Sequence, residues 1–206
     1  MPLADCTILL VRHAHVAMAG RFCGSSDPSL SALGLSQLHK LAETLTHLPL
    51  THIFSSDLRR AQQTANFIAV RAWLPVECLP ELREMQFGEW EGLDWEQVCA
   101  RDAAYAERWM AEYPRLSAPG GEHFEAFRTR VRAALAEVVT RTAGGCAAVV
   151  THGGVVRTIL LDVLALPESS LAGLSSEYAS CIELRLCDGH WRIISEGGLR
   201  QQQTNS

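Results

Sequence analysis

Two short apolar runs in this chain each end at a histidine, and they constrain the fold more than any other feature. Residues 8–11 precede Arg12 and His13, and residues 147–151 precede His152. A short, wholly apolar run is typical of a strand buried on both faces of a parallel sheet. Polar side chains just past the carboxyl ends of such strands collect in one crevice of an open α/β sheet. We therefore expect His13 and His152 at the same edge of a mostly parallel sheet.

The second run continues into a pattern that favours anion binding. Gly153 and Gly154 follow His152, and an apolar helical period then begins at Val155. Glycines let a backbone approach a ligand closely, and the N-terminus of a helix attracts negative charge. Gly153 is therefore a candidate substrate-binding residue.

Composition bounds the class of protein. The chain has 206 residues, of which 48% are hydrophobic, and a net charge of -5. This length suits one domain over residues 1–206 with a sizeable core, and the negative charge argues against a nucleic-acid partner. We find neither a membrane-length apolar run nor a signal peptide, and we expect a soluble cytoplasmic protein. A homodimer is compatible with this sequence.

The cysteines point to a reducing compartment. Seven are present, an odd number, and no two of them form a Cys-x-x-Cys pair. This pattern favours reduced thiols over a disulfide framework or a zinc site.

A long loop is expected after the first strand, over residues 14–30. It contains Gly24 and Ser25 and has no helical or strand period. Loops of this length inside a domain usually form a lid or a pocket wall, so Gly24 and Ser25 are candidate substrate-binding residues. A helix should begin near Ser31, which is a good N-cap.

A second helix should follow a short strand at residues 53–56, with Ser56 or Asp57 as its cap. Helical phasing turns Arg60 toward the apolar face and Arg59 toward a polar one. Arg60 therefore should point into the same crevice as Arg12.

The remaining chain gives weaker signals. Residues 81–92 are rich in acidic and aromatic side chains without a clear period, and we expect Trp90 and Trp95 to anchor this segment by burial. The other expected elements are a third strand at 75–79, a helical insertion at about 94–118, a long helix after 121, a hairpin of 181–186 and 191–194, and a polar tail at about 198–206.

These residues suit one kind of chemistry. Two arginines can bind the oxygens of a phosphoryl group, and they favour the unprotonated form of a nearby histidine. Neutral histidine can attack phosphorus, and a carboxylic acid can protonate the leaving oxygen. This scheme needs no metal and no cofactor, and its partner is a small-molecule phosphate ester.

The chain resembles the histidine phosphatase superfamily, also called the phosphoglycerate mutase-like fold, over roughly residues 7–165. The resemblance rests on blocks at residues 10–13, 27–34, 55–65, 81–88 and 150–154 in the family's order. It implies a three-layer α/β/α sandwich with a mostly parallel central sheet. It also implies that His13 is the phosphorylated nucleophile, that Glu84 is the proton donor, and that Arg12, Arg60 and His152 hold the phosphoryl group.

Within the family, residues 87–92 and 119–122 look most like the α-ribazole phosphatase branch. That likeness implies removal of the 5′-phosphate of α-ribazole 5′-phosphate in cobalamin biosynthesis. A sugar-phosphate phosphatase or a phosphoglycerate mutase is the alternative, although Val16 and Ala19 replace the mutase branch's serine and asparagine. The chain also departs from the family at Ala14, where glycine is usual, and at His15. If position 14 needs a positive φ, the loop there must be reshaped.

Two alternatives come from other classes. In a metal-dependent hydrolase, His13 and His15 would be paired ligands, although the barrel that uses this arrangement typically needs about 250 residues. In a non-catalytic phosphate-binding protein, the arginines would act without Glu84.

Overall fold

The computed structural model describes residues 4–45, 48–174 and 176–197. Six strands form one sheet in the order β3-β2-β4-β1-β5-β6. The strands are β1 (Cys6–Arg12), β2 (His52–Ser55), β3 (Val76–Cys78), β4 (Cys146–Thr151), β5 (Cys181–Cys187) and β6 (His190–Gly197). Strands β1 to β4 run parallel, and β5 pairs antiparallel with both β1 and β6.

The two central strands, β1 and β4, explain why the two histidines meet. They pair in parallel with Val11 opposite Val150 and Arg12 opposite Thr151. His13 continues the register, because its backbone N–H donates to the Thr151 carbonyl at 2.8 Å. The expectation of one shared sheet edge is confirmed.

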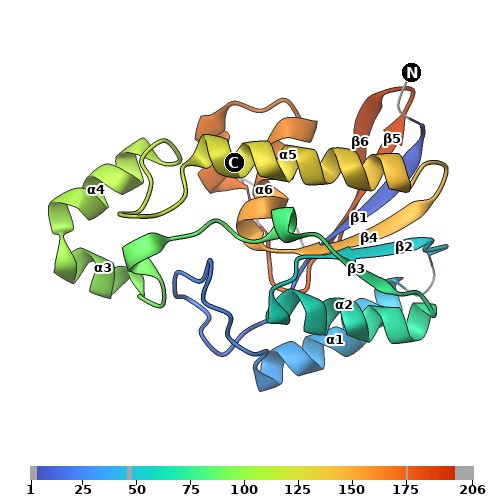
Figure 1. The fold of residues 1–206 in the computed structure, drawn as a ribbon, viewed down its shortest axis with the longest axis horizontal. Helices are drawn as coiled ribbons and strands as arrows, with labels where there is room; N and C mark the ends of the chain where they lie inside the picture. The colour runs from blue at the N-terminus through green and yellow to red at the C-terminus, as the bar shows by residue number, and fades with distance from the viewer. Residues whose placement is uncertain (1–3, 46–47, 175, 198–206) are drawn as a thin grey trace, which may run out of the picture.

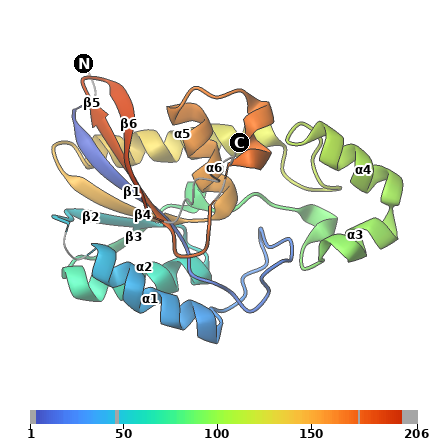
Figure 2. The same ribbon diagram turned by 180° about the vertical axis from the view of Figure 1, so that it is seen from behind.

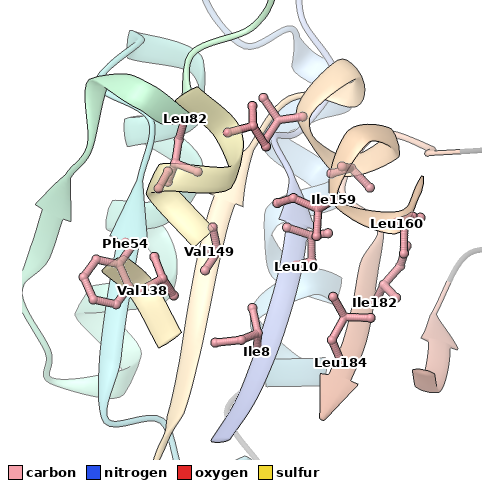
Figure 3. Close-up of a cluster of buried hydrophobic side chains, with 14 of the residues drawn as sticks. Ile8, Leu10, Phe54, Leu82, Val138, Val149, Ile159, Leu160, Ile182 and Leu184 are labelled. Carbon is pink, nitrogen blue, oxygen red and sulfur yellow. The ribbon is translucent and has the colours of Figure 1, made fainter. Parts of the chain in front are cut away.

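Helices cover both faces of the sheet, which confirms the expected three-layer sandwich. α1 (Ala32–Leu45) and α2 (Arg59–Ala72) lie on one face, and α5 (Phe124–Arg141) and α6 (Gly153–Val163) lie on the other (Figures 1 and 2). Strand β1 serves both layers because its side chains alternate between the faces. Leu9 packs toward α1 and α2, whereas Leu10 packs with Ile159 of α6 (Figure 3).

The sequence predicted the N-cap of α1 correctly and that of α2 incorrectly. Ser31 caps α1 as expected, because its Oγ accepts the Gly34 N–H at 3.1 Å. The predicted cap of α2 at Ser56 or Asp57 was wrong. The N-cap is Leu58, and the Asp27 carboxylate from the 14–30 loop accepts the Arg59 N–H at 2.6 Å instead. The Asp27 side chain, more than thirty residues away, therefore accepts the hydrogen bond that we expected Ser56 or Asp57 to accept.

The carboxyl-terminal hairpin forms the sheet edge as predicted. β5 and β6 flank Asp188 and Gly189, which have φ values of 50° and 77°. Positive φ at both central residues is the requirement of the tight turn that suits twisted strands. The predicted tail at 198–206 lies outside the described residues.

Between β3 and α5 the chain extends away from the sheet (Figure 1). It contains the short 3₁₀ helices Pro80–Leu82 and Gly88–Trp90, followed by α3 (Trp95–Arg101) and α4 (Ala103–Glu112), so the helical expectation there is confirmed. Another 3₁₀ helix, Glu168–Gly173, follows α6. Trp90 is 4% exposed, but the predicted burial of Trp95 was wrong, since 38% of it is exposed. Trp95 covers the outside of the aromatic cluster whose centre Trp90 occupies.

None of the helices in the described ranges combines the length and apolarity needed to cross a membrane.

Candidate active site

A cavity of about 200 Å³ lies where β1 ends. Arg12, His13, Arg60 and Glu84, four of the five predicted catalytic residues, line it directly. The other lining residues are Val16, Met18, Arg21, Phe22, Cys23, Phe87, Arg157 and Tyr178. The structure therefore brings together residues that are more than seventy positions apart in the chain.

His13 is buried, and one hydrogen bond fixes its tautomer. Its Nδ1 lies 2.8 Å from the Ala14 carbonyl oxygen. A carbonyl oxygen only accepts, so Nδ1 carries the proton and Nε2 keeps its lone pair. Burial lowers the pKa of His13 to about 3, and the positive charge of Arg60 adds to this effect. The imidazole is thus neutral at any mildly acidic or neutral pH.

His152 packs against His13, with the ring centroids 5.1 Å apart. It is the N-cap residue of α6, and its Nε2 bonds the Ser56 hydroxyl at 2.8 Å. Complete burial, together with the positive charges of Arg60 and Arg12, places the pKa of His152 well below its usual range. Its Nδ1 is buried without a hydrogen-bond partner in the part of the chain that the structure describes. A buried polar atom of this kind is costly unless a ligand satisfies it.

Arg12 is held at the cavity by its neighbours. One terminal nitrogen donates to the Ser176 carbonyl at 2.5 Å, and the guanidinium lies 3.7 Å from the centroid of the Tyr178 ring. Burial lowers the pKa of Arg12, although the group stays cationic at any physiological pH. Its Nε is buried and has no partner among the described residues. Arg12 therefore also offers an unused donor.

Arg60 is 1% exposed, which confirms its inward phasing, whereas Arg59 is exposed. The two terminal nitrogens of Arg60 donate hydrogen bonds to the 14–30 loop. One donates to Ser26 O at 2.7 Å and Asp27 Oδ1 at 3.3 Å, and the other to Cys23 O and Gly24 O at 2.9 and 3.2 Å. These bonds fix a positive charge at the cavity wall and tie the loop to α2.

Glu84 reaches the cavity from the irregular segment between β3 and α3. Its two carboxylate oxygens accept the Gly154 N–H at 2.9 Å and the Met85 N–H at 3.0 Å. A Cβ at position 154 would lie 2.2 Å from Glu84 Oε1, so a larger residue there would displace the Glu84 carboxylate. The first turn of α6 thus both carries His152 at its cap and positions a carboxyl group.

The predicted substrate-binding residues Gly24, Ser25 and Gly153 are not among the residues that line the cavity. The backbone N–H groups of Gly24 and Ser25 donate to the Glu91 carboxylate at 3.1 and 2.9 Å. Gly153 lies against Arg12, since a Cβ at that position would meet Arg12 Cζ at 3.4 Å. Contact between these three residues and a substrate stays a prediction, and for Gly24 and Ser25 the amide donors are already in use.

The two departures from the family pattern are accommodated structurally. Positive φ at non-glycine positions occurs at Trp73, Ala165, Ala179 and Asp188 among the described residues, so Ala14 avoids the left-handed region. His15 Nδ1 bonds the Ser31 hydroxyl at 2.8 Å, and its ring packs on Tyr178 with centroids 5.0 Å apart. These contacts give His15 a supporting role beside the site.

Sequence reasoning missed Tyr178, Ser56 and Arg157. Arg157 lies one helical turn after Gly153, so phasing of the His-Gly-Gly unit could have located it. Tyr178 just precedes β5, whose first residue pairs with the end of β1. Only knowledge of that antiparallel pairing could have brought Tyr178 to the site.

The donor set does not resemble a metal centre. Among residues that the structure describes, no group of three or more His, Cys, Asp or Glu side chains has a metal-binding arrangement. His13 and His15 direct their Nδ1 atoms to different oxygens, which gives the paired-ligand alternative no geometric support.

Comparison with known proteins identifies the family of the chain. The family model "Histidine phosphatase superfamily (branch 1)" matches residues 8–197. The chain is 29% identical over 182 residues to an adenosylcobalamin/alpha-ribazole phosphatase of Salmonella typhimurium, covering 87% of this chain and 90% of the relative. It is 34% identical over 194 residues to a metal-independent phosphoserine phosphatase of Arabidopsis thaliana, covering 91% and 79%.

Among solved structures, the Bacillus stearothermophilus protein YhfR superposes with a TM-score of 0.86 at 26% identity, covering 95% of this chain and 98% of the other. The chain therefore belongs to the histidine phosphatase superfamily. This membership confirms the expected phosphoglycerate mutase-like fold and the expected enzyme class, a phosphatase.

Proposed function

We propose that the protein hydrolyses a small phosphate monoester through a phosphohistidine at His13. The observation that carries this proposal is the geometry of that side chain. Its Nδ1 proton is fixed on the Ala14 carbonyl, so Nε2 keeps its lone pair in a cavity lined by Arg12 and Arg60.

In the first step, Nε2 of His13 attacks phosphorus and a nitrogen–phosphorus bond forms. The bond from phosphorus to the ester oxygen breaks, and that oxygen takes a proton from Glu84 as the alcohol leaves. Arg12 and Arg60 stabilise the negative charge on the transferring phosphoryl oxygens. The unpartnered Arg12 Nε and His152 Nδ1 gain an acceptor in that phosphoryl group.

In the second step, water attacks phosphorus and the nitrogen–phosphorus bond breaks. Glu84, now a carboxylate, accepts a proton from the water, and inorganic phosphate leaves. The Nδ1–H bond to Ala14 stabilises the phosphohistidine, because the ring carries positive charge while it is phosphorylated. The enzyme then returns to its starting state.

For the substrate, we propose α-ribazole 5′-phosphate, with a role in cobalamin biosynthesis. The motifs at residues 87–92 and 119–122 and the name of the Salmonella relative support this choice. The cavity wall adds the rings of Phe22, Phe87 and Tyr178, which suit the flat base of a nucleoside monophosphate. All seven cysteines are unpaired, as expected in a reducing compartment, and we propose a cytoplasmic location.

The test is phosphate release from a panel of esters in the presence of EDTA. The panel contains α-ribazole 5′-phosphate, 3-phosphoglycerate, fructose 2,6-bisphosphate and nitrophenyl phosphate, and His13→Ala is the control. Release that is led by α-ribazole 5′-phosphate and lost in His13→Ala supports both mechanism and substrate. Release led by another ester refutes the substrate, and absence of His13-dependent release refutes the mechanism.

A further inference from the structure

Arg157 differs from the other three arginines of the cavity because it has no partner. Arg12 donates to Ser176, Arg60 donates to the 14–30 loop, and Arg21 is paired with Asp94. No hydrogen bond or ion pair joins Arg157 to any residue within the described ranges, and its Nε is buried. An arginine that is partly buried and unpaired is unusual, because desolvation of its charge is costly.

Glu84 lines the same cavity as Arg157 but forms no ion pair with it. Both of its oxygens are taken by the backbone N–H groups of Gly154 and Met85. The environment of Arg157 also includes Arg12 and Tyr113. Burial lowers the pKa of Arg12, and the charge of Arg157 contributes to that decrease. Burial raises the pKa of Tyr113, and Arg157 opposes that rise. The cavity therefore holds the positive charge of Arg157 in addition to those of Arg12 and Arg60, which the proposed mechanism uses to bind the phosphoryl group.

We propose that the cavity also accepts esters with a second acidic group, a carboxylate or a second phosphate, and that Arg157 is the specificity-determining residue that binds this group. Arg12 and Arg60 take the phosphoryl group that is transferred, and Arg157 takes an acid carried by the leaving group. A planar guanidinium with free donors suits either acid, since it can form two parallel hydrogen bonds with it.

This inference rests on the proposed phosphatase activity but not on the proposed substrate. α-Ribazole 5′-phosphate has no second acidic group and gains nothing from Arg157. The inference therefore adds a second class of substrate for the same cavity, esters with a second acidic group, and one assay separates the two substrate classes.

Two pairs of esters test the inference, each differing by one acidic group. 3-Phosphoglycerate and glycerol 3-phosphate differ in a carboxylate, and fructose 1,6-bisphosphate and fructose 1-phosphate differ in a phosphate. The variants are Arg157→Gln, Arg157→Lys to keep the charge, and Arg192→Gln as a matched control. Arg192 is an exposed arginine on β6, an edge strand of the sheet.

A hydrogen-bonded charge pair contributes about 1.5–3 kcal/mol, so Arg157→Gln should lower kcat/KM about 10- to 100-fold on the ester that carries the extra acid. Its partner ester should change less than about threefold, Arg157→Lys should recover part of the loss, and Arg192→Gln should change neither. A selective loss in the first pair assigns a carboxylate, and a selective loss in the second assigns a phosphate.

Equal losses within both pairs, or no loss in either, overturn the inference while the phosphatase activity stands. If the unmodified protein shows no His13-dependent release even from nitrophenyl phosphate, the proposed function fails, and the inference fails with it.

Discussion

Arg59 and Arg60 are adjacent, yet the structure assigns them very different importance, and a matched pair of substitutions tests this. Arg60 is 1% exposed and makes four hydrogen bonds with its terminal nitrogens, three to backbone carbonyls and one to Asp27. The Arg59 side chain is exposed. Replacing Arg60 with alanine removes all four bonds and leaves the three carbonyls of the 14–30 loop without their donor.

Each hydrogen bond from a charged group contributes about 1.5–3 kcal/mol, and Arg60→Ala removes several of them around a buried side chain, so we expect it to lower the free energy of unfolding by about 3–5 kcal/mol. Arg59→Ala should change it by less than about 0.5 kcal/mol, as is usual for an exposed position. For kcat/KM on nitrophenyl phosphate, we expect a loss on the order of 100-fold or more for Arg60→Ala and less than about threefold for Arg59→Ala.

The assays are urea denaturation followed by tryptophan fluorescence and initial-rate kinetics on the folded fraction. Arg60→Lys serves as a second variant if Arg60→Ala fails to fold, because it keeps the charge but cannot bridge four acceptors. A larger loss for Arg59→Ala, or a change below about 1 kcal/mol for Arg60→Ala, would refute the reasoning.

Three further predictions concern other parts of the site. Glu84→Gln should lower kcat/KM about 100-fold or more on alkyl phosphates but less than about tenfold on nitrophenyl phosphate, whose leaving group needs no proton; equal losses would remove Glu84 from the donor role. Because the pKa of His13 falls from 6.5 to about 3 on folding, unfolding takes up a proton between these values. The stability that neutral His13 contributes is thus complete above pH 6.5 and is lost as the pH falls toward 3. His13→Gln lacks this titrating group, so its urea midpoint should depend less steeply on pH than that of the unmodified protein. An unchanged slope would contradict this assignment. Glu91→Gln should reduce kcat/KM by about tenfold on every ester alike, since an amide cannot accept all the N–H groups of residues 24–26 that hold the Arg60 loop; unaltered kinetics would show that the loop keeps its place without Glu91.

The parts of the site that lie on regular elements could be predicted from the sequence. The apolar runs before His13 and His152 define strands, and the parallel pairing of β1 and β4 then brings the two histidines together. Helical phasing placed Arg60 correctly because it depends only on neighbours in the same helix. Glu84 lies in a segment without a period, and only its resemblance to the family pattern singled it out.

Features that depend on contacts between distant segments could not be predicted in this way. Asp27 caps α2 across more than thirty residues, and Glu91 binds the amides of the 14–30 loop from a 3₁₀ turn. Nothing in the local sequence around Asp27 or Glu91 reveals its partner. Trp95 was expected to be buried because large aromatic residues usually are, but its ring packs against the outer side of Trp90 and is 38% exposed.

The central claim is that a phosphoryl group is transferred to His13, and trapping that intermediate tests the claim most directly. Glu84→Gln should be mixed with radiolabelled nitrophenyl phosphate, quenched rapidly in alkali, where phosphohistidine survives, and mapped by peptide mass spectrometry. The first step remains fast with this leaving group, while the water attack that needs Glu84 slows, so the intermediate should accumulate. We predict label on the peptide that contains His13 and none in a variant that also carries His13→Ala. Continued phosphate release without protein-bound label, or label on another residue, would contradict the account.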